Sequence, residues 1–288
     1  VVSAPHAARV ARRLAALDLL VVCDPLPSET AAVADVVLPT AQWAEEDGTT
    51  TNLEGRVLRR RRATPPPPGV RTDLAVLADL AGRLGHPGAV NADPAAVFAE
   101  LRRASAGGVA DYAGITWDRV AAEDGVFWPC PAERHPGTPR LFADRFPTPD
   151  GRARFVPVDH RPGAEEPDAA YPVYLTTGRV LQHYQSGTQT RRVPALVDAV
   201  PDPFVELHPD LASRLAVEEG EWVHVVSRRG RATGRARVTA TIRPDTVFMP
   251  FHWPGTGRVN TVTNPALDPT SRMPEFKVCA VRVERAAS

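Results

Sequence analysis

The first 85 residues alternate helical and strand-like hydrophobic patterns. In "HAARVARRLAALD" apolar and basic residues recur at helical spacing, whereas "LLVVCD" and "ADVVLP" are short, apolar and rich in β-branched residues. Strands that are apolar throughout and lie between helices are typical of parallel sheets that are buried on both faces. We therefore predict an α/β domain over residues 1–85.

A later helix of this part is predicted over "DLAVLADLAGRLG", with Asp73 as a candidate N-cap and Gly85 at its end. Beyond it the pattern weakens. Another helix is predicted over "DPAAVFAELRRAS", and irregular, proline-rich sequence follows up to "RPGAEEPDAA". We expect residues 86–170 to form a connector between two folded parts.

From residue 171 onward the pattern changes to short strands separated by glycine and proline turns. The predicted strands lie in "YPVYLTTG", "PFVELHP", "EWVHVVSRRGRATGRARVTATI", "DTVFMPFHW" and "KVCAVRVE". One small helix, "DLASRLAV", interrupts them. Closely spaced short strands of this kind predict a compact β-barrel over residues 171–288.

The composition is that of an ordinary globular protein and argues against several classes. With 288 residues, of which 43% are hydrophobic and 24% charged, one or two folded domains are expected. No apolar run approaches the roughly 20 residues that span a bilayer, so we expect no membrane partner. The formal net charge is +0, and the "RRRR" run at residues 59–62 contains no aromatic residue, which argues against a nucleic-acid partner.

The cysteines and the start of the chain bear on its context. Cys23, Cys130 and Cys279 lie far apart and show no metal-ligand spacing, so neither a disulfide framework nor a cysteine metal site is expected. The chain begins at Val1 without a signal sequence, and a helical pattern starts almost at once. We interpret the chain as a fragment of a longer protein.

The densest candidate site is the run "LTTGRVLQHYQSGTQTRR", residues 175–192. Glycine lets the backbone approach a ligand, and neighbouring N–H groups and hydroxyls can donate hydrogen bonds to anionic oxygens. Such a loop suits phosphate or a pterin, and the alternative is a polar loop that satisfies its own hydrogen bonds. His183 has no second ligand at helical or turn spacing, which favours an orienting histidine over a metal ligand. Arg191 and Arg192 fit either a phosphate clamp or a solvated loop end.

A second cluster follows the strand-like run "DTVFMP". Residues 251–253, Phe-His-Trp, either line a pocket or tuck a strand end under the barrel, and Asn260 offers an amide that matches the edge of a heterocycle. Because the 175–192 run and Asn260 both follow apolar strand-like runs, we expect them to face one another. Asp24 directly follows a predicted parallel strand, where a carboxylate can bind a guanine edge or a ribose hydroxyl, or can cap a helix. The chain contains no nucleophile-elbow, zinc-protease or P-loop motif.

Two stretches resemble the molybdopterin oxidoreductases. "ETAAVADVVLPTAQWAEEDGTTTNLEGRV" is similar to the family segment in which an ADVVLP strand leads to an acidic turn and an N-x-E-G-R stretch. The tail, from "YPVYLTTGRVLQHYQSGTQTRR" through "FMPFHW" and "VNTVTNP" to "LDPTSRMPEFKVCAV", resembles the family's C-terminal pterin-binding domain. Within the family the chain looks most similar to assimilatory nitrate reductases, with periplasmic nitrate reductases and formate dehydrogenase large subunits as near relatives.

The resemblance implies a fold, cofactors and partners. The tail is expected to form a double-psi β-barrel, and the part before it the C-terminal portion of a parallel-sheet α/β domain that binds a dinucleotide. The implied cofactors are molybdenum held by bis(molybdopterin guanine dinucleotide) and a 4Fe-4S cluster in an upstream part. The implied partners are nitrate as a small-molecule substrate and an electron-donor protein or domain, in the cytoplasm.

Matching the family residue by residue places the expected cofactor contacts in three stretches. The first is the loop of Thr177, Gly178, Arg179, Val180, Leu181, Gln182, His183, Tyr184, Gln185 and Ser186. The second comprises Phe251, Asn260 and Lys277, the only lysine of the chain. The third, in the α/β part, comprises Cys23, Asp24 and Asp73. Glu46 stands where periplasmic relatives usually have lysine, so that position is left out.

The resemblance places no catalytic residue in this chain, because the family's cluster cysteines and molybdenum ligand lie upstream of the matched part. The full-length enzyme is expected to move an oxygen atom from nitrate to reduced molybdenum. Two alternatives stay open. One is a formate dehydrogenase large subunit, which removes a hydride, and the other is a noncatalytic pterin-binding or interaction module.

Overall fold

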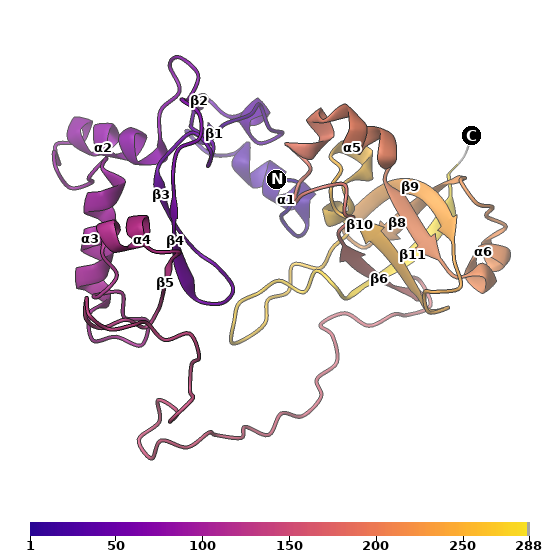
Figure 1. Ribbon diagram of the computed structural model, residues 1–288. Helices are drawn as coiled ribbons and strands as arrows, with labels where there is room; N and C mark the ends of the chain where they lie inside the picture. Colours follow the sequence, from indigo (N-terminus) through magenta and orange to yellow (C-terminus); the bar gives the residue numbers. More distant parts are fainter. Residues whose placement is uncertain (287–288) are drawn as a thin grey trace. The chain divides into compact units, whose positions relative to one another are not determined.

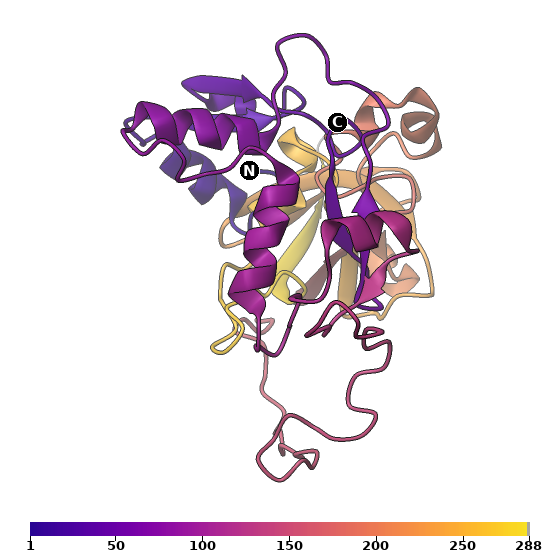
Figure 2. The same ribbon diagram turned by 60° about the vertical axis from the view of Figure 1, so that its left-hand side comes forward.

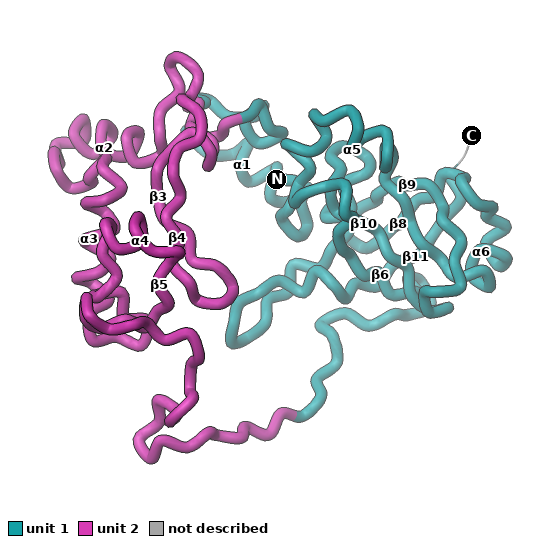
Figure 3. Tube along the Cα trace, viewed as in Figure 1, with its two compact units in different colours: residues 1–22, 26–37, 159–288 teal, residues 23–25, 38–158 magenta. Residues whose placement is uncertain are grey.

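The computed structural model describes residues 1–286 and divides into two compact units, each of which is described by itself (Figures 1 and 3). The barrel unit comprises residues 1–22, 26–37 and the chain from residue 159 onward. The sheet unit comprises residues 23–25 and 38–158. Among the described residues no helix is long and apolar enough to cross a membrane.

Six strands of the barrel unit close into a barrel. They are β6 (Val173–Gly178), β7 (Phe204–Leu207), β8 (Trp222–Ser227), β9 (Gly230–Val238), β10 (Thr246–Pro250) and β11 (Cys279–Arg285). Their order around the barrel is β10-β6-β11-β8-β9-β7. β10 runs parallel to β6 and β7 runs parallel to β9, whereas β11 is antiparallel to both β6 and β8. Because the barrel is closed, each of these six strands has a neighbour on both sides among the described residues.

The interior of the barrel follows from the two-residue period of its strands. In β6, Val173, Leu175 and Thr177 are buried and alternate with less buried positions. In β9 the inward positions are small residues, among them Ala232 and Ala236. Val173, Leu175, Ala232 and Ala236 belong to one continuous apolar core, in which full burial of a valine or leucine side chain contributes about 1.5–3 kcal/mol.

The barrel unit also contains short helices. They are α1 (Ala7–Leu14), α5 (Pro194–Ala199), α6 (Pro209–Leu215) and the 3-10 helices η1 (Ala31–Val33), η2 (Thr190–Arg192), η3 (Gly255–Gly257) and η4 (Val259–Thr261). The helix α6 begins where the His208 ring accepts a hydrogen bond from the Asp210 amide. It buries Leu211 and Ala212 in the barrel core, which explains its amphipathic sequence.

A short strap, residues 163–168, is fastened to the barrel through Glu165. This carboxylate accepts hydrogen bonds from Arg228 (2.9 Å) and Arg229 (2.6 Å), and from the backbone amide of Ala280 (3.2 Å). The Glu165 side chain is only 11% exposed. The strap is therefore held by charge as well as by backbone hydrogen bonds.

The strands β1 (Val21–Asp24) and β2 (Val36–Pro39) form a two-stranded sheet. The prediction that both are buried on two faces is wrong, because Val21, Val36 and Val37 are 46%, 41% and 44% exposed. Among residues 1–286 each of these strands has only the other as a sheet neighbour. Two strands alone cannot enclose the side chains of either face.

The sheet unit is built on a three-stranded antiparallel sheet, visible beside its helices in Figure 2. The elements are β3 (Gly48–Thr51), β4 (Arg56–Arg60), β5 (Val126–Phe127), α2 (Asp73–Arg83), α3 (Pro94–Ser105) and α4 (Trp117–Ala122). A small core joins Val57 of β4 with Phe98 of α3, Val120 of α4 and Val126 of β5.

Two details of the sheet unit differ from the sequence-based expectation. The N-cap of α2 is Thr72, whose hydroxyl accepts from the Ala75 amide at 3.2 Å, and Asp73 is the first residue of the helix. Residues 86–158 of the expected connector contain α3, α4 and β5, which pack together with β4. Residues 152–170 have no helix or strand. The predicted fold class, an α/β part followed by a β-barrel, is confirmed, and the structure shows that the barrel is closed and has six strands.

Candidate functional site

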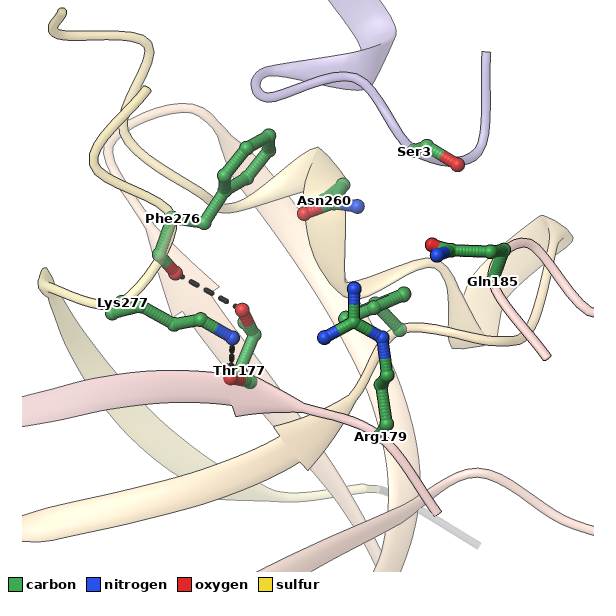
Figure 4. A pocket seen from close by; sticks show the side chains of 8 residues that line it. Ser3, Thr177, Arg179, Gln185, Asn260, Phe276 and Lys277 are labelled. Atoms are coloured by element: carbon green, nitrogen blue, oxygen red, sulfur yellow. Dashed lines mark hydrogen bonds between the residues drawn. The ribbon is translucent and has the colours of Figure 1, made fainter. Parts of the chain in front are cut away.

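A pocket of about 190 Å³ lies at one end of the barrel (Figure 4). Because β6 and β10 are parallel and β11 is antiparallel to β6, the ends of β6 and β10 meet the start of β11 there. The pocket is lined by Ser3, Thr177, Arg179, Gln185, Phe251, Asn260, Phe276 and Lys277. Six of these eight residues belong to the contacts expected from the sequence. The 175–192 run and Asn260 therefore face a common space.

The floor of the pocket is formed where β6 ends. The hydroxyl of Thr177 donates to the carbonyl of Phe276 at 3.1 Å, and the ammonium of Lys277 donates to the carbonyl of Thr177. A Cβ at Gly178 would lie 2.5 Å from the ring of Phe248 in the adjacent strand, so this position has no room for a side chain. The strand end and the start of β11 are thus tied together.

Two cations converge on the pocket. The guanidinium carbon of Arg179 lies 5.2 Å from the ring centre of Phe251, and the ammonium of Lys277 lies 5.8 Å from the same centre. Neither cation has a carboxylate partner among residues 1–286. Burial lowers the pKa of Lys277 below its usual 10.5, and the charge of Arg179 lowers this pKa further. Two like charges in one partly buried space favour an anionic ligand.

The β6 loop, residues 179–189, is fixed by a histidine that the sequence did not single out as its partner. His252 is fully buried, accepts a hydrogen bond from the Val180 amide at Nε2 (3.0 Å) and contacts the Gln185 carbonyl through Nδ1 (2.6 Å). Its neighbour Phe251 donates its backbone N–H to the Gly178 carbonyl at 3.2 Å. In the sequence, the only signal for this role of His252 is that a titratable residue stands inside the apolar run "FMPFHW".

The side chains of His183 and Trp253 hold the C-terminal end of the same loop. His183 is buried and bonds through its two ring nitrogens to the Thr190 hydroxyl and the Val200 carbonyl, both at 3.1 Å. The ring of Trp253 packs edge-on against His183 and donates its N–H to the Pro201 carbonyl at 3.3 Å. Both ring nitrogens of His183 are thus engaged by the loop end and by the segment after α5. The described residues contain no group of three side chains suited to hold a metal ion.

Asn260 and the two arginines after the β6 loop make structural contacts. The Asn260 amide donates to the Val2 carbonyl at 2.9 Å and accepts from the Thr263 hydroxyl at 3.2 Å, so part of its hydrogen-bonding capacity is already used. Arg191 pairs with Glu29 at 2.6 Å. Arg192 donates to the carbonyls of Thr188 and Pro27. Each arginine therefore ties the end of the loop to the segment around Pro27 and Glu29 of the barrel unit.

The remaining expected contacts are distributed over both units. In the β6 loop Leu181 and Tyr184 are 101% and 67% exposed, whereas Val180, Gln182 and Ser186 are partly buried. Cys23 and Asp24 lie in the sheet unit, at the end of β1. Asp73 lines another cavity of the sheet unit, of about 250 Å³, together with residues of β3, β4 and α3. None of these three is part of the barrel pocket.

Comparison with protein families identifies two matched regions. Residues 173–280 match the family model described as "Molydopterin dinucleotide binding domain". Residues 1–83 match the model described as "Molybdopterin oxidoreductase". The two models together cover both the barrel and the segment that contains β1, β2 and α2.

Individual relatives match nearly the whole chain. The chain is 44% identical to the assimilatory nitrate reductase catalytic subunit of Bacillus subtilis, over 98% of this chain and 40% of the relative. It is 45% identical to the F420-dependent formate dehydrogenase subunit alpha of Methanocaldococcus jannaschii, over 99% of this chain and 42% of the relative. The chain thus spans about two fifths of the length of these relatives.

A solved structure supports the same fold. Acetylene hydratase from Pelobacter acetylenicus matches with a TM-score of 0.73 at 20% sequence identity, over 98% of this chain and 42% of that structure. At that identity the match concerns the fold alone. The matched regions, the similarity to full-length relatives and the shared fold agree, and the chain belongs to the molybdopterin oxidoreductase family.

Proposed function

We propose that this chain is the C-terminal part of a molybdenum-dependent nitrate reductase and that it holds the guanine dinucleotide portion of the cofactor. The observation that carries the proposal is the pair of uncompensated cations, Arg179 and Lys277, in the barrel pocket. A pyrophosphate-bearing ligand supplies the negative charge that this pocket lacks. The residues present therefore fit a pterin dinucleotide.

The contributions of the chain itself are binding and orientation. Arg179 and Lys277 would neutralise phosphate charge, and each charge-assisted hydrogen bond contributes about 1.5–3 kcal/mol. Phe251 would present an aromatic face, and the β6 loop would supply backbone and side-chain donors. In the sheet unit Cys23, Asp24 and Asp73 are proposed as further contacts on the strength of the family resemblance. When bound, the molybdenum cofactor supplies the oxygen-atom transfer and the two-electron chemistry.

The rest of the proposed enzyme lies outside this chain. A 4Fe-4S cluster would pass electrons from a donor protein or domain, and the molybdenum ligand would come from the same upstream part. The proposed setting is the cytoplasm, as for an assimilatory enzyme. Because the residues of the barrel pocket are proposed to bind the dinucleotide, the choice between nitrate and another small substrate is assigned to the upstream part of the enzyme.

Formate oxidation is the second candidate. It is favoured by the 45% identity to a formate dehydrogenase subunit alpha, a value close to the 44% identity to a nitrate reductase catalytic subunit. The two reactions differ in what moves, since nitrate reduction transfers an oxygen atom and formate oxidation removes a hydride.

One assay separates the two candidates. Purified full-length enzyme is given nitrate with a reduced viologen dye, and in parallel formate with an oxidised dye, and molybdenum content is measured on the same sample. We expect nitrate-dependent dye oxidation and formation of one nitrite per two electrons. Formate turnover without nitrate turnover in molybdenum-loaded enzyme contradicts the nitrate proposal and supports the second candidate.

A further inference from the structure

His252 makes two hydrogen bonds that span the β6 loop. Its Nε2 lies 3.0 Å from the Val180 amide nitrogen, and its Nδ1 lies 2.6 Å from the Gln185 carbonyl oxygen. An amide N–H can only donate and a carbonyl oxygen can only accept, so Nε2 must accept and Nδ1 must carry the proton. The ring is therefore neutral and in one defined tautomer.

The bond to Gln185 holds a backbone conformation that is otherwise unfavourable. Gln185 has φ of 48°, in the left-handed region that non-glycine residues rarely occupy. A residue of this kind persists where surrounding contacts fix it. Two positions later, Gly187 has φ of 74°, and a Cβ there would lie 2.4 Å from the His252 carbonyl oxygen. The histidine thus contacts the loop with its backbone as well as with its ring.

The position of Gln185 matters because its side chain lines the barrel pocket, as Figure 4 shows. Val180, the other anchor, directly follows Arg179, one of the two cations of the pocket. A change in either anchor would move a residue of the pocket wall. His252 itself is fully buried and is not among the residues that line the pocket.

We propose that His252 is a positioning residue, whose neutral ring holds Val180 and Gln185 so that the pocket can accept the dinucleotide. This inference rests on the proposed cofactor-binding role of the pocket. The groups that face the ring are Arg179 and His183 from the loop, and Arg191 lies beside Gly187. None of them is a carboxylate that would stabilise a protonated ring.

The environment of the ring predicts the direction in which this arrangement depends on pH. Burial lowers the pKa of His252 below 6.5, the bond to Gln185 raises it, and His183 and Arg179 lower it. The folded protein thus binds a proton at this ring less readily than the unfolded chain does. The order of the loop is fully present above pH 6.5 and is lost as the pH falls through the pKa of the folded state.

The test compares three substitutions with a matched control. His252→Asn keeps a donor near Gln185, His252→Gln keeps an acceptor near Val180, and His252→Phe fills the space with neither. His224→Asn is the control, because His224 lies in β8, away from the β6 loop, and its ring bonds to the Thr233 hydroxyl at 3.0 Å. Hydrogen exchange by mass spectrometry on the full-length protein follows peptides that cover the β6 loop, β8 and β9. Molybdenum and guanine nucleotide content are measured on the same preparations.

We expect loop peptides of His252→Phe to exchange about tenfold faster or more, since roughly 1.4 kcal/mol corresponds to one decade. Cofactor content should fall by a similar factor, His252→Gln and His252→Asn should be intermediate, and His224→Asn should match the wild type. If β8 and β9 peptides also exchange faster in His252→Phe, this variant has lost its fold. The loop exchange and cofactor content of His252→Gln and His252→Asn then test the proposal. Unchanged loop exchange overturns the proposal, and so does faster loop exchange with unchanged cofactor content. Neither readout uses nitrate, so a failure of the nitrate assay is seen separately.

Discussion

The ammonium of Lys277, the only lysine in the chain, donates a hydrogen bond to the backbone carbonyl of Thr177 at the end of β6. This bond places a compact positive charge at the floor of the barrel pocket, beside the guanidinium of Arg179. A second guanidinium would be broader and would need more room than an ammonium. The identity of this residue is therefore expected to matter for cofactor binding.

The first prediction concerns the charge of Lys277. Lys277→Met keeps most of the side-chain length but removes the donor, and it should reduce the molybdenum content of full-length enzyme by roughly tenfold or more, because a charged hydrogen bond contributes about 1.5–3 kcal/mol. Lys277→Arg should restore little of it. The control is Arg243→Met, which removes an exposed cation that pairs with Asp245 outside the pocket. Wild-type molybdenum content in Lys277→Met would mean that the lysine has no role in binding.

A second prediction concerns the strap that Glu165 fastens to the barrel. Burial raises the pKa of Glu165, but the hydrogen bond from Arg229 and the amide of Ala280 outweigh burial, and the pKa lies below its usual 4.5. The folded state then binds fewer protons at this carboxylate than the unfolded state. Its contribution to stability is fully present above pH 4.5 and is lost as the pH falls through the pKa of the folded state.

Glu165→Gln should therefore lower the free energy of unfolding by about 2 kcal/mol or more near neutral pH, because it leaves Arg229 partly buried without its partner. As the pH is lowered from 5 to 3 in steps of about one pH unit, the free energy of unfolding of Glu165→Gln should also fall less steeply than that of the wild type. Glu284→Gln is the control, since Glu284 is 42% exposed and pairs with the exposed Arg282. Urea unfolding at each pH gives both quantities. Parallel pH profiles for wild type and Glu165→Gln would rule out the proposed contribution.

Much of the barrel was predictable because its strands carry a local signal. Alternating buried positions such as Val173 and Leu175 set the strand period, and glycine and proline turns mark the ends. The β6 loop, Phe251 and Lys277 follow or precede such strands, so their location at strand ends was also predictable. The sequence also predicted that this loop and Asn260 face one another, but the approach of Phe251 and Lys277 to the same pocket depends on the pairing of β6 with β10 and β11, which no local pattern specifies.

The features that the sequence did not predict depend on distant partners. His252 bonds to Val180 and Gln185, which lie 72 and 67 residues away, and Arg191 pairs with Glu29 across 162 residues. The burial of β1 and β2 was overestimated because the apolar composition of a strand does not determine how many neighbouring strands cover it. The N-cap of α2 was misassigned by one residue, although the hydroxyl of Thr72 was visible in the sequence.

A third prediction concerns the ion pair between Arg191 and Glu29. The side chains are 20% and 32% exposed, and the pair joins the region after the β6 loop to the segment around η1. A double-mutant cycle of Glu29→Gln and Arg191→Met should give a coupling free energy of about 1 kcal/mol, more than an exposed pair provides. The pair Arg235 and Asp202, 45% and 44% exposed, is the comparison. A coupling no larger than that of the comparison pair would show that Arg191 does not fasten the loop through its charge.

The last prediction uses two leucines that lie six positions apart. Leu175 is fully buried in the barrel core, whereas Leu181 in the β6 loop is 101% exposed. Leu175→Ala should lower the free energy of unfolding by about 2–5 kcal/mol, because it removes buried methyl groups and leaves a cavity. Leu181→Ala should change that free energy by less than about 0.5 kcal/mol.

The same two variants separate folding from binding. If Leu181 contacts the cofactor, as its place in the matched loop implies, Leu181→Ala lowers molybdenum content while the unfolding midpoint of the cofactor-free protein stays at the wild-type value. An exposed leucine of this size has apolar surface to bury against a ligand, at about 25 cal/mol for each Å² removed from water. Leu175→Ala should lower both quantities, because a weakened barrel also loosens the strand end that carries Thr177. Equal molybdenum content in Leu181→Ala and wild type would mean that the exposed leucine serves neither the fold nor the cofactor.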